Sequence, residues 1–176
     1  MGMKKDDKQA LIAEVNAVAT TAQSAVAAHY RGLTVSQMTQ LRARARGQGV
    51  YVRVVKNTLA RMAVKGTSFE VLGDALKGPM ILAFSREEPG AAARVVKDFN
   101  KENEALVPVA VAIGGQLLPG SELGRVATLP TREQALAQLA GLLKAPVEKL
   151  VRTIAEPAAK FVRTVAAVRD QKQQAG

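Results

Sequence analysis

An eleven-residue unit occurs twice in succession near the C-terminal end of the chain, at 146–156 and 157–167. Six of its eleven positions are identical in the two copies, and two more exchange one large apolar side chain for another. Eleven residues make close to three turns of an α-helix, so side chains one repeat apart return to nearly the same face. The repeat therefore predicts a long helix that carries one apolar stripe more than once.

The apolar stripe has three clusters at one spacing, because the block 135–145 fits the register of the two repeats more loosely. Its members are Leu139 and Leu143, then Leu150, Val151 and Ile154, then Phe161, Val162 and Val165. A repeated stripe on an extended helix suggests a repeated docking site for a partner. The alternative, a duplicated amphipathic helix packed on its own domain, is equally compatible with the repeat alone.

Proline stands at the start of each repeat, at Pro146 and Pro157. Proline removes a backbone donor and clashes with the preceding turn, but it suits the first turn of a new helical segment. We therefore expect a segmented or kinked helix from residue 131 to about residue 172. Because short segments divided by proline are marginal helices in water, we expect this helix to be poorly ordered until a partner buries its stripe.

Residues 1–130 alternate between strand and helix patterns. Apolar spacing predicts strands at 24–30, 50–55, 80–84 and 107–113, and helices at 4–20, 35–47, 58–64, 68–76 and 91–103. Strand–helix–strand units with short links predict an α/β (α+β) sandwich. Residues 117–128 have the composition of a linker, so we expect a globular domain with linker at 1–130 and a helical extension at 131–176.

Composition excludes several classes of protein. The chain has no cysteine, which excludes disulfides and cysteine-based zinc or thiol chemistry. Its N-terminal residues do not resemble a signal peptide, and no uncharged run is long and unbroken enough to cross a bilayer. We therefore expect a soluble protein of the cytoplasm.

We find no convincing catalytic or metal site in the sequence, and we predict neither an enzyme nor a cofactor. The only histidine, His29, lies in a predicted strand without a cysteine or a carboxylate nearby. This setting favours a structural role or a place at the edge of an RNA site. No glycine-rich run has the lysine and the serine or threonine that end a phosphate loop.

The net charge of +10 is unevenly distributed. Residues 1–66 contain 11 Lys/Arg and 3 Asp/Glu, whereas residues 67–130 contain 6 and 8. This basic N-terminal third predicts a polyanionic partner. Because aromatic residues are scarce, we expect recognition of a folded RNA by its backbone and shape.

The candidate RNA-binding residues lie at the ends of predicted elements. Lys56 and Arg61 flank the start of a predicted helix, whose free backbone N–H groups already favour phosphate. Arg42, Arg44 and Arg46 alternate along another helix, which spreads them around it, and they are not among the candidates. The full set is Lys4, Lys5, Lys8, Arg31, Gly32, Arg53, Lys56, Asn57, Thr58 and Arg61.

Seven stretches resemble, in the same order, the family of bacterial large-subunit ribosomal protein ten, the stalk-base protein. They are Asp7–Ala10, Arg31–Val35, Val54–Leu59, Gly78–Pro79, Pro89–Arg94, Ala127–Thr131 and Val162–Asp170. The resemblance extends over essentially the whole chain, and Val54–Leu59 is its most specific part. It implies a ferredoxin-like domain bound to large-subunit rRNA beside ribosomal protein eleven.

The same resemblance implies that the C-terminal helix holds dimers of the acidic stalk protein seven/twelve, which recruit translational GTPases. With three apolar clusters, we predict three dimers. Two other functions stay open. One is a nucleic-acid-binding regulator that represses its own mRNA, and the other is a peripheral membrane protein that uses the basic amphipathic tail.

Overall fold

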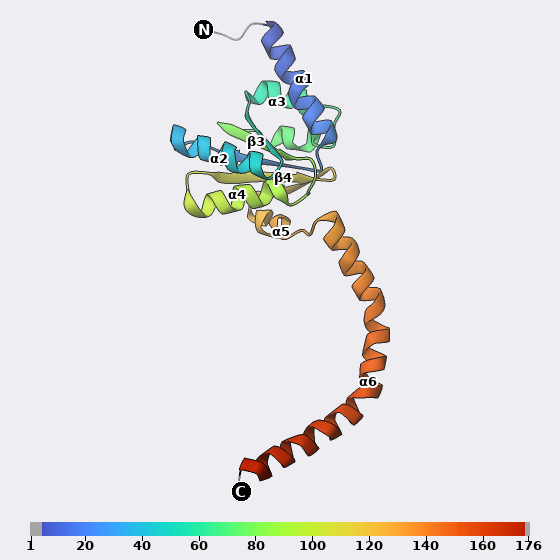
Figure 1. The fold of residues 1–176 in the computed structure, drawn as a ribbon. Helices are drawn as coiled ribbons and strands as arrows, with labels where there is room; N and C mark the ends of the chain where they lie inside the picture. Colours follow the sequence, from blue (N-terminus) through green and yellow to red (C-terminus); the bar gives the residue numbers. More distant parts are fainter. Residues whose placement is uncertain (1–4, 175–176) are drawn as a thin grey trace. The chain divides into compact units, whose positions relative to one another are not determined.

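The computed structural model describes residues 5–174. The chain divides into two compact units, Met1–Thr131 and Arg132–Gly176. The first unit contains one sheet with helices on both faces, and the second is a single helix (Figure 1).

The sheet has five strands in the order β2-β3-β1-β4-β5, and all neighbouring strands are antiparallel. Their bounds are β1 Ser24–His29, β2 Val50–Val54, β3 Met80–Ser85, β4 Val107–Ile113 and β5 Gln116–Pro119. A helix connects β1 to β2, another connects β3 to β4, and each crossover skips one strand. This is the predicted ferredoxin-like arrangement, extended at one edge by β5. The opposite edge strand is β2.

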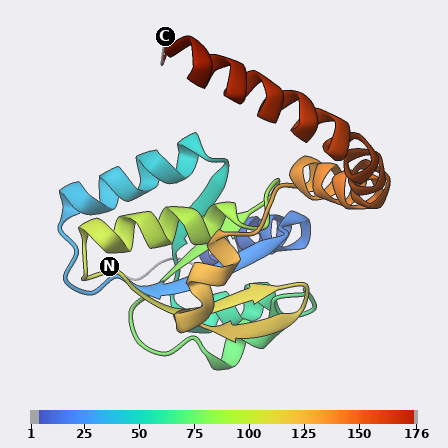
Figure 2. The same ribbon diagram turned by 90° about the horizontal axis from the view of Figure 1, so that it is seen from below.

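Helices cover both faces of this sheet. Their bounds are α1 Lys5–Thr21, α2 Val35–Gly47, α3 Asn57–Val64, η1 Glu70–Asp74, α4 Ala91–Glu102, η2 Gly120–Glu122 and α5 Leu123–Ala127. The crossover helices α2 and α4 lie side by side over one face and share its core with α5 (Figure 2). Helices α1, α3 and η1 cover the other face.

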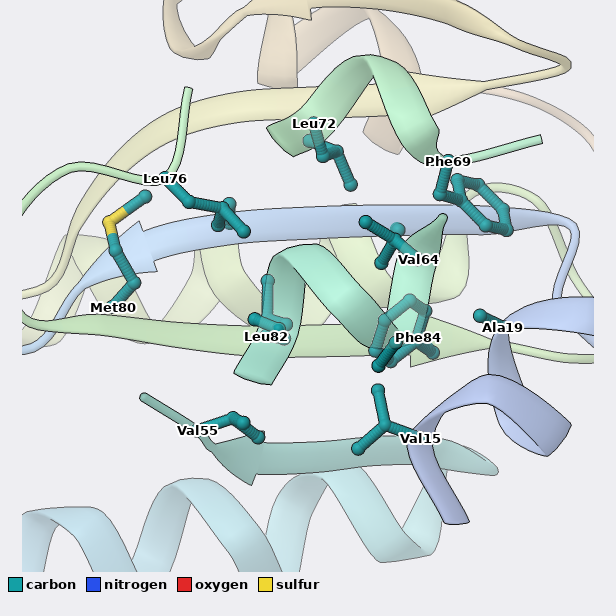
Figure 3. Packing of buried hydrophobic residues seen from close by; sticks show 14 of the residues in the cluster. Val15, Ala19, Val55, Val64, Phe69, Leu72, Leu76, Met80, Leu82 and Phe84 are labelled. Carbon is teal, nitrogen blue, oxygen red and sulfur yellow. The ribbon is translucent and has the colours of Figure 1, made fainter. Parts of the chain in front are cut away.

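The strands supply both cores by alternation. In β3, Met80, Leu82 and Phe84 point to the α1 face, whereas Ile81 and Ala83 point to the α2 face. Figure 3 shows the first core, where residues of β3 meet α1, α3 and η1. The rings of Phe69 and Phe84 pack edge to face there with centroids 6.0 Å apart. A strand buried on both faces explains why the apolar runs of the sequence are nearly continuous.

The start of α2 is fixed by a capping box. The Thr34 side chain accepts a hydrogen bond from the Gln37 backbone N–H, and the Gln37 side chain accepts one from the Thr34 N–H at 2.8 Å. This pair satisfies two of the backbone donors that a helix start leaves open. Because α2 is fixed at Thr34, the turn that precedes it is fixed too.

Two sequence predictions need correction. Residues 117–128 are not a linker: they form β5, η2 and α5, and Leu123, Val126 and Ala127 are buried. A Cβ on Gly120 would lie 2.1 Å from the Pro108 carbonyl oxygen, so this segment packs tightly on β4. The second correction concerns 68–76, where the expected helix is only the short 3-10 helix η1, in which Gly73 disfavours a longer helix.

The second unit is α6, Arg132–Gln174, a helix of 43 residues that contains both Pro146 and Pro157. The helix is continuous through both prolines, and its ribbon bends along its length (Figure 1). Proline leaves the carbonyl four residues before it without its helical partner, which is an ordinary cause of such bending. The predicted kinked helix is therefore one element that starts at the expected place.

Candidate nucleic-acid interface

The start of α3 holds three of the candidate residues. Lys56 is the extended, exposed residue before the helix, and no side chain caps this end. Asn57 is turned inward, because its side-chain amide donates to the Gly78 carbonyl at 2.8 Å. Thr58 is exposed. An uncapped helix start beside a lysine offers backbone N–H groups and a positive charge to an anion.

Arg61 lies within α3, and its side chain is bonded to two backbone carbonyls further along the chain. Its Nε donates to the Gly73 carbonyl at 2.9 Å and its Nη2 to the Leu76 carbonyl at 3.0 Å. These bonds tie α3 to η1 and the loop that follows. Arg61 is still exposed, so its remaining donors are accessible to solvent.

The other N-terminal candidates are dispersed. Lys4 lies outside the described residues, Lys5 begins α1, and Lys8 is half-buried on it. Arg31 and Gly32 form the turn after β1, where Gly32 has φ +96°, a conformation that suits glycine. Lys56, Asn57 and Thr58 line one hollow at the start of α3. Lys5, Lys8, Arg31 and Gly32 are not among the residues that line it.

Arg53 projects from β2, the free edge strand, and reaches α1. Its Nη2 lies 3.6 Å from Glu14 Oε2, while the Tyr51 hydroxyl donates to Glu14 Oε1 at 2.5 Å. Burial, reinforced by this hydrogen bond, raises the pKa of Tyr51 to about 12. Glu14 therefore receives contacts from two residues of the same strand.

A hollow of about 550 Å³ runs along β2, and the sequence analysis did not predict it. Its walls are Gly49 to Val54 and four arginines, Arg42, Arg46, Arg53 and Arg86. Arg42 and Arg46 are four residues apart on α2 and share one face of it. Spacing could have paired these two, but only the fold brings them to β2 and to Arg86.

Arg44, between them, faces elsewhere. It makes a bidentate pair with Glu102 of α4 at 2.7 and 2.8 Å, and its guanidinium lies 5.7 Å from the Phe99 ring centroid. The hydrogen bonds from Arg44 lower the pKa of Glu102, and the same bonds raise the pKa of Arg44. Arg44 therefore joins α2 to α4.

Over residues 5–174 no group of three or more His, Asp or Glu side chains is arranged to hold a metal ion. The Nδ1 of His29 lies 3.2 Å from the Pro79 carbonyl oxygen, beside Gly78. None of the described helices has the length and apolar character required to span a membrane.

The apolar stripe of α6 is open to solvent. The eight predicted residues Leu139, Leu143, Leu150, Val151, Ile154, Phe161, Val162 and Val165 are between 55% and 73% exposed. Four further large apolar residues of the helix are also exposed: Leu136, Leu142, Val147 and Val168. Leu136, Val147 and Val168 fall outside the repeated Leu-Val-Arg-Thr-Ile core, and Leu142 stands where the two repeats have Thr153 and Thr164, so the repeat did not select them.

The fold and its surfaces define a basic ferredoxin-like domain that carries a long helix with an unburied apolar stripe. Family models match both parts: Ribosomal protein L10 matches residues 3–101, and Ribosomal protein uL10 C-terminal region matches residues 129–155 and 156–175. The boundary between these two C-terminal matches falls one residue before Pro157, where the second repeat starts.

Curated relatives agree. The chain is 64% identical to the large ribosomal subunit protein uL10 of Methylococcus capsulatus, over 99% of this chain and 100% of the relative. It is 57% identical to that of Alcanivorax borkumensis, over 99% of both chains. The chain belongs to the ribosomal protein L10 (uL10) family of the large ribosomal subunit. This membership confirms the predicted family and the predicted location on the ribosome.

Proposed function

We propose that this chain is a structural constituent of the stalk base of the large ribosomal subunit, with no catalytic role. Residues 1–131 bind large-subunit rRNA beside ribosomal protein eleven. Helix α6 anchors dimers of the acidic stalk protein, which recruit translational GTPases. One observation carries the proposal: the basic third of the chain and the unburied apolar stripe occupy two separate units.

The RNA half of the proposal is supported by the start of α3 and by charge. Lys56 is exposed beside backbone N–H groups that no side chain caps. Phosphate contacts release counterions, so affinity for the rRNA falls steeply as salt rises. Replacing Lys56 with alanine weakens binding by about 1 kcal/mol. Arg61→Ala also weakens it, but its bonds to Gly73 and Leu76 make part of that loss structural.

The stalk half is supported by the repeated stripe. A repeated apolar face that is exposed along a helix of 43 residues marks an interaction site. One docking unit per eleven residues provides about 16 Å of helix for each dimer. The three clusters therefore accommodate three dimers, or six stalk chains. The first cluster differs from the others, because Gly141 stands where Arg152 and Arg163 stand in the repeats.

The experiment is reconstitution of the full chain with the stalk protein, followed by native mass measurement at saturation. A mass with six stalk chains supports three docking units. A mass with four limits docking to the two repeats, and Leu139 and Leu143 are then ordinary surface residues. The double variant Leu150→Ser with Ile154→Ser removes one dimer. The control Arg152→Gln with Thr153→Ser, which retains the stripe, keeps every dimer.

A further inference from the structure

The four arginines along β2 form a surface with no assigned partner. Arg42 and Arg46 come from α2, Arg53 from β2 itself, and Arg86 follows β3. All four are exposed. Within residues 5–174 neither Arg42 nor Arg86 forms an ion pair, whereas Arg53 is held by Glu14 at 3.6 Å. The guanidinium groups of Arg42 and Arg86 are accordingly available to an external anion.

The strand between them adds backbone donors. Among residues 5–174, β2 pairs only with β3, so its other edge presents N–H and C=O groups without ladder partners there. The hollow is lined by every residue from Gly49 to Val54, which places it along this edge. Guanidinium groups bind phosphate through paired donors, and backbone N–H groups bind the same oxygens. The edge of β2 and the arginines therefore both suit a phosphate group as the ligand.

A second hollow lies next to this one, at the start of α3. Val54 lines both this hollow and the neighbouring one, whose walls include Lys56, Asn57 and Thr58. From Val50 to Lys56 an extended chain covers about 20 Å at 3.3 Å per residue. This length is sufficient to run beside several consecutive phosphates of one RNA strand.

We propose that the free edge of β2, with Arg42, Arg46, Arg53 and Arg86, is a phosphate-binding track that leads the RNA backbone to the start of α3. The proposal rests on the RNA-binding function proposed above and assigns its principal contact surface. An acidic peptide added to β2 as a sixth strand suits the surface less well. Such a strand ends with β2, whereas the cationic surface continues past Val54 to Lys56.

Glu14 acts on this track as an internal competitor. Its carboxylate holds Arg53 as a phosphate would, and it also accepts the Tyr51 hydroxyl. Removing the Glu14 charge frees Arg53 and makes the edge more positive. We therefore expect Glu14→Gln to raise RNA affinity about twofold to threefold, a gain that loss of a merely structural contact does not produce.

The decisive test uses the full chain and a folded fragment of stalk-base rRNA. Arg42→Gln with Arg86→Gln lowers affinity at least about tenfold and reduces the slope of log affinity against log salt by about 1.5. The control Arg44→Gln with Arg125→Gln removes the same charge and stays within about twofold of wild type. Arg44 and Arg125 lie outside the track, where Arg44 pairs with Glu102 and Arg125 with Glu122. Circular dichroism verifies that each variant is folded.

The outcomes separate the two proposals. If the wild-type chain does not bind the rRNA fragment, the proposed function fails. If the wild type binds and both double variants bind equally well, only the track is refuted. Labelled poly-glutamate serves as the probe for an acidic peptide. If the track variant loses poly-glutamate but keeps RNA, the surface belongs to a protein partner. If Glu14→Gln lowers RNA affinity, Arg53 does not contact phosphate.

Discussion

The two units of this chain place the same kinds of apolar side chain in opposite environments. In the first unit, leucine, valine and phenylalanine lie between a sheet and its helices; Phe84 is 0% exposed. In α6 the same residue types face solvent, and Phe161 is 70% exposed. The first unit is stabilised by its own core, whereas the large apolar side chains of α6 stay exposed, and in the proposed function a partner buries them.

Replacing one phenylalanine in each unit gives the largest contrast. Phe84→Ala removes a ring packed against Phe69 and costs about 3–5 kcal/mol of unfolding free energy. Phe161→Ala leaves the unfolding midpoint unchanged, because the Phe161 ring is exposed and packs in no core. This variant instead weakens stalk-protein binding. Urea unfolding and titration with the stalk protein measure the two effects. Equal loss of stability in both variants would contradict the separation of the units.

Removing a proline tests whether the prolines limit the helix content of α6 in the free chain. Pro157→Ala restores a helical hydrogen bond and favours the helix by about 3 kcal/mol at that site. The far-ultraviolet helical signal of the stalk-free chain therefore increases. Pro130→Ala, which lies before α6, provides the control and leaves the signal unchanged. An unchanged signal for Pro157→Ala would mean that the free helix is already complete.

Gly120 tests the packing of the segment that the sequence suggested was a linker. Gly120→Ala forces a Cβ to within 2.1 Å of the Pro108 carbonyl oxygen and destabilises the first unit by about 1–3 kcal/mol. Gly124→Ala is the matched control, since its Cβ meets nothing within 4 Å and alanine favours helix α5. Thermal unfolding distinguishes them. A tolerated Gly120→Ala would restore the linker interpretation.

The smallest effect concerns pH and the Arg44–Glu102 pair. Arg44 lowers the folded-state pKa of Glu102 below its ordinary value of 4.5, so the pair stabilises the fold above that value. This contribution disappears as pH falls through the lowered pKa. Wild type and Glu102→Gln should therefore differ slightly in urea midpoint at pH 7 and converge as pH falls below the lowered pKa of Glu102. If the difference in urea midpoint did not change with pH, it would not come from the ionisation of Glu102.

Sequence reasoning succeeded where a residue pattern is compatible with only one kind of local structure. Short apolar runs at 80–84 and 107–113 located strands, and Thr34 with Gln37 located a cap. It failed at 117–128, because Pro119 and Gly120 are typical of linkers and equally of a close backbone approach. That approach depends on Pro108, which no local pattern connects to Gly120.

The arrangement of the candidate RNA-binding residues was likewise predictable only where the residues are neighbours in sequence. Lys56, Asn57 and Thr58 are contiguous, so their common position at a helix start was predictable from the sequence. The β2 hollow combines Arg42, Arg53 and Arg86 from three elements, and only the strand order β2-β3 brings Arg86 to it. Whether RNA occupies these positions remains a prediction.

The central claim is that RNA binding and stalk binding belong to different units. Native mass measurement of the full chain and of residues 1–131, each mixed with the rRNA fragment and the stalk protein, tests this claim most directly. The full chain should carry one RNA and six stalk chains. The fragment should keep the RNA and lose every stalk chain. A fragment that retains stalk chains, or that loses the RNA together with them, would contradict the account.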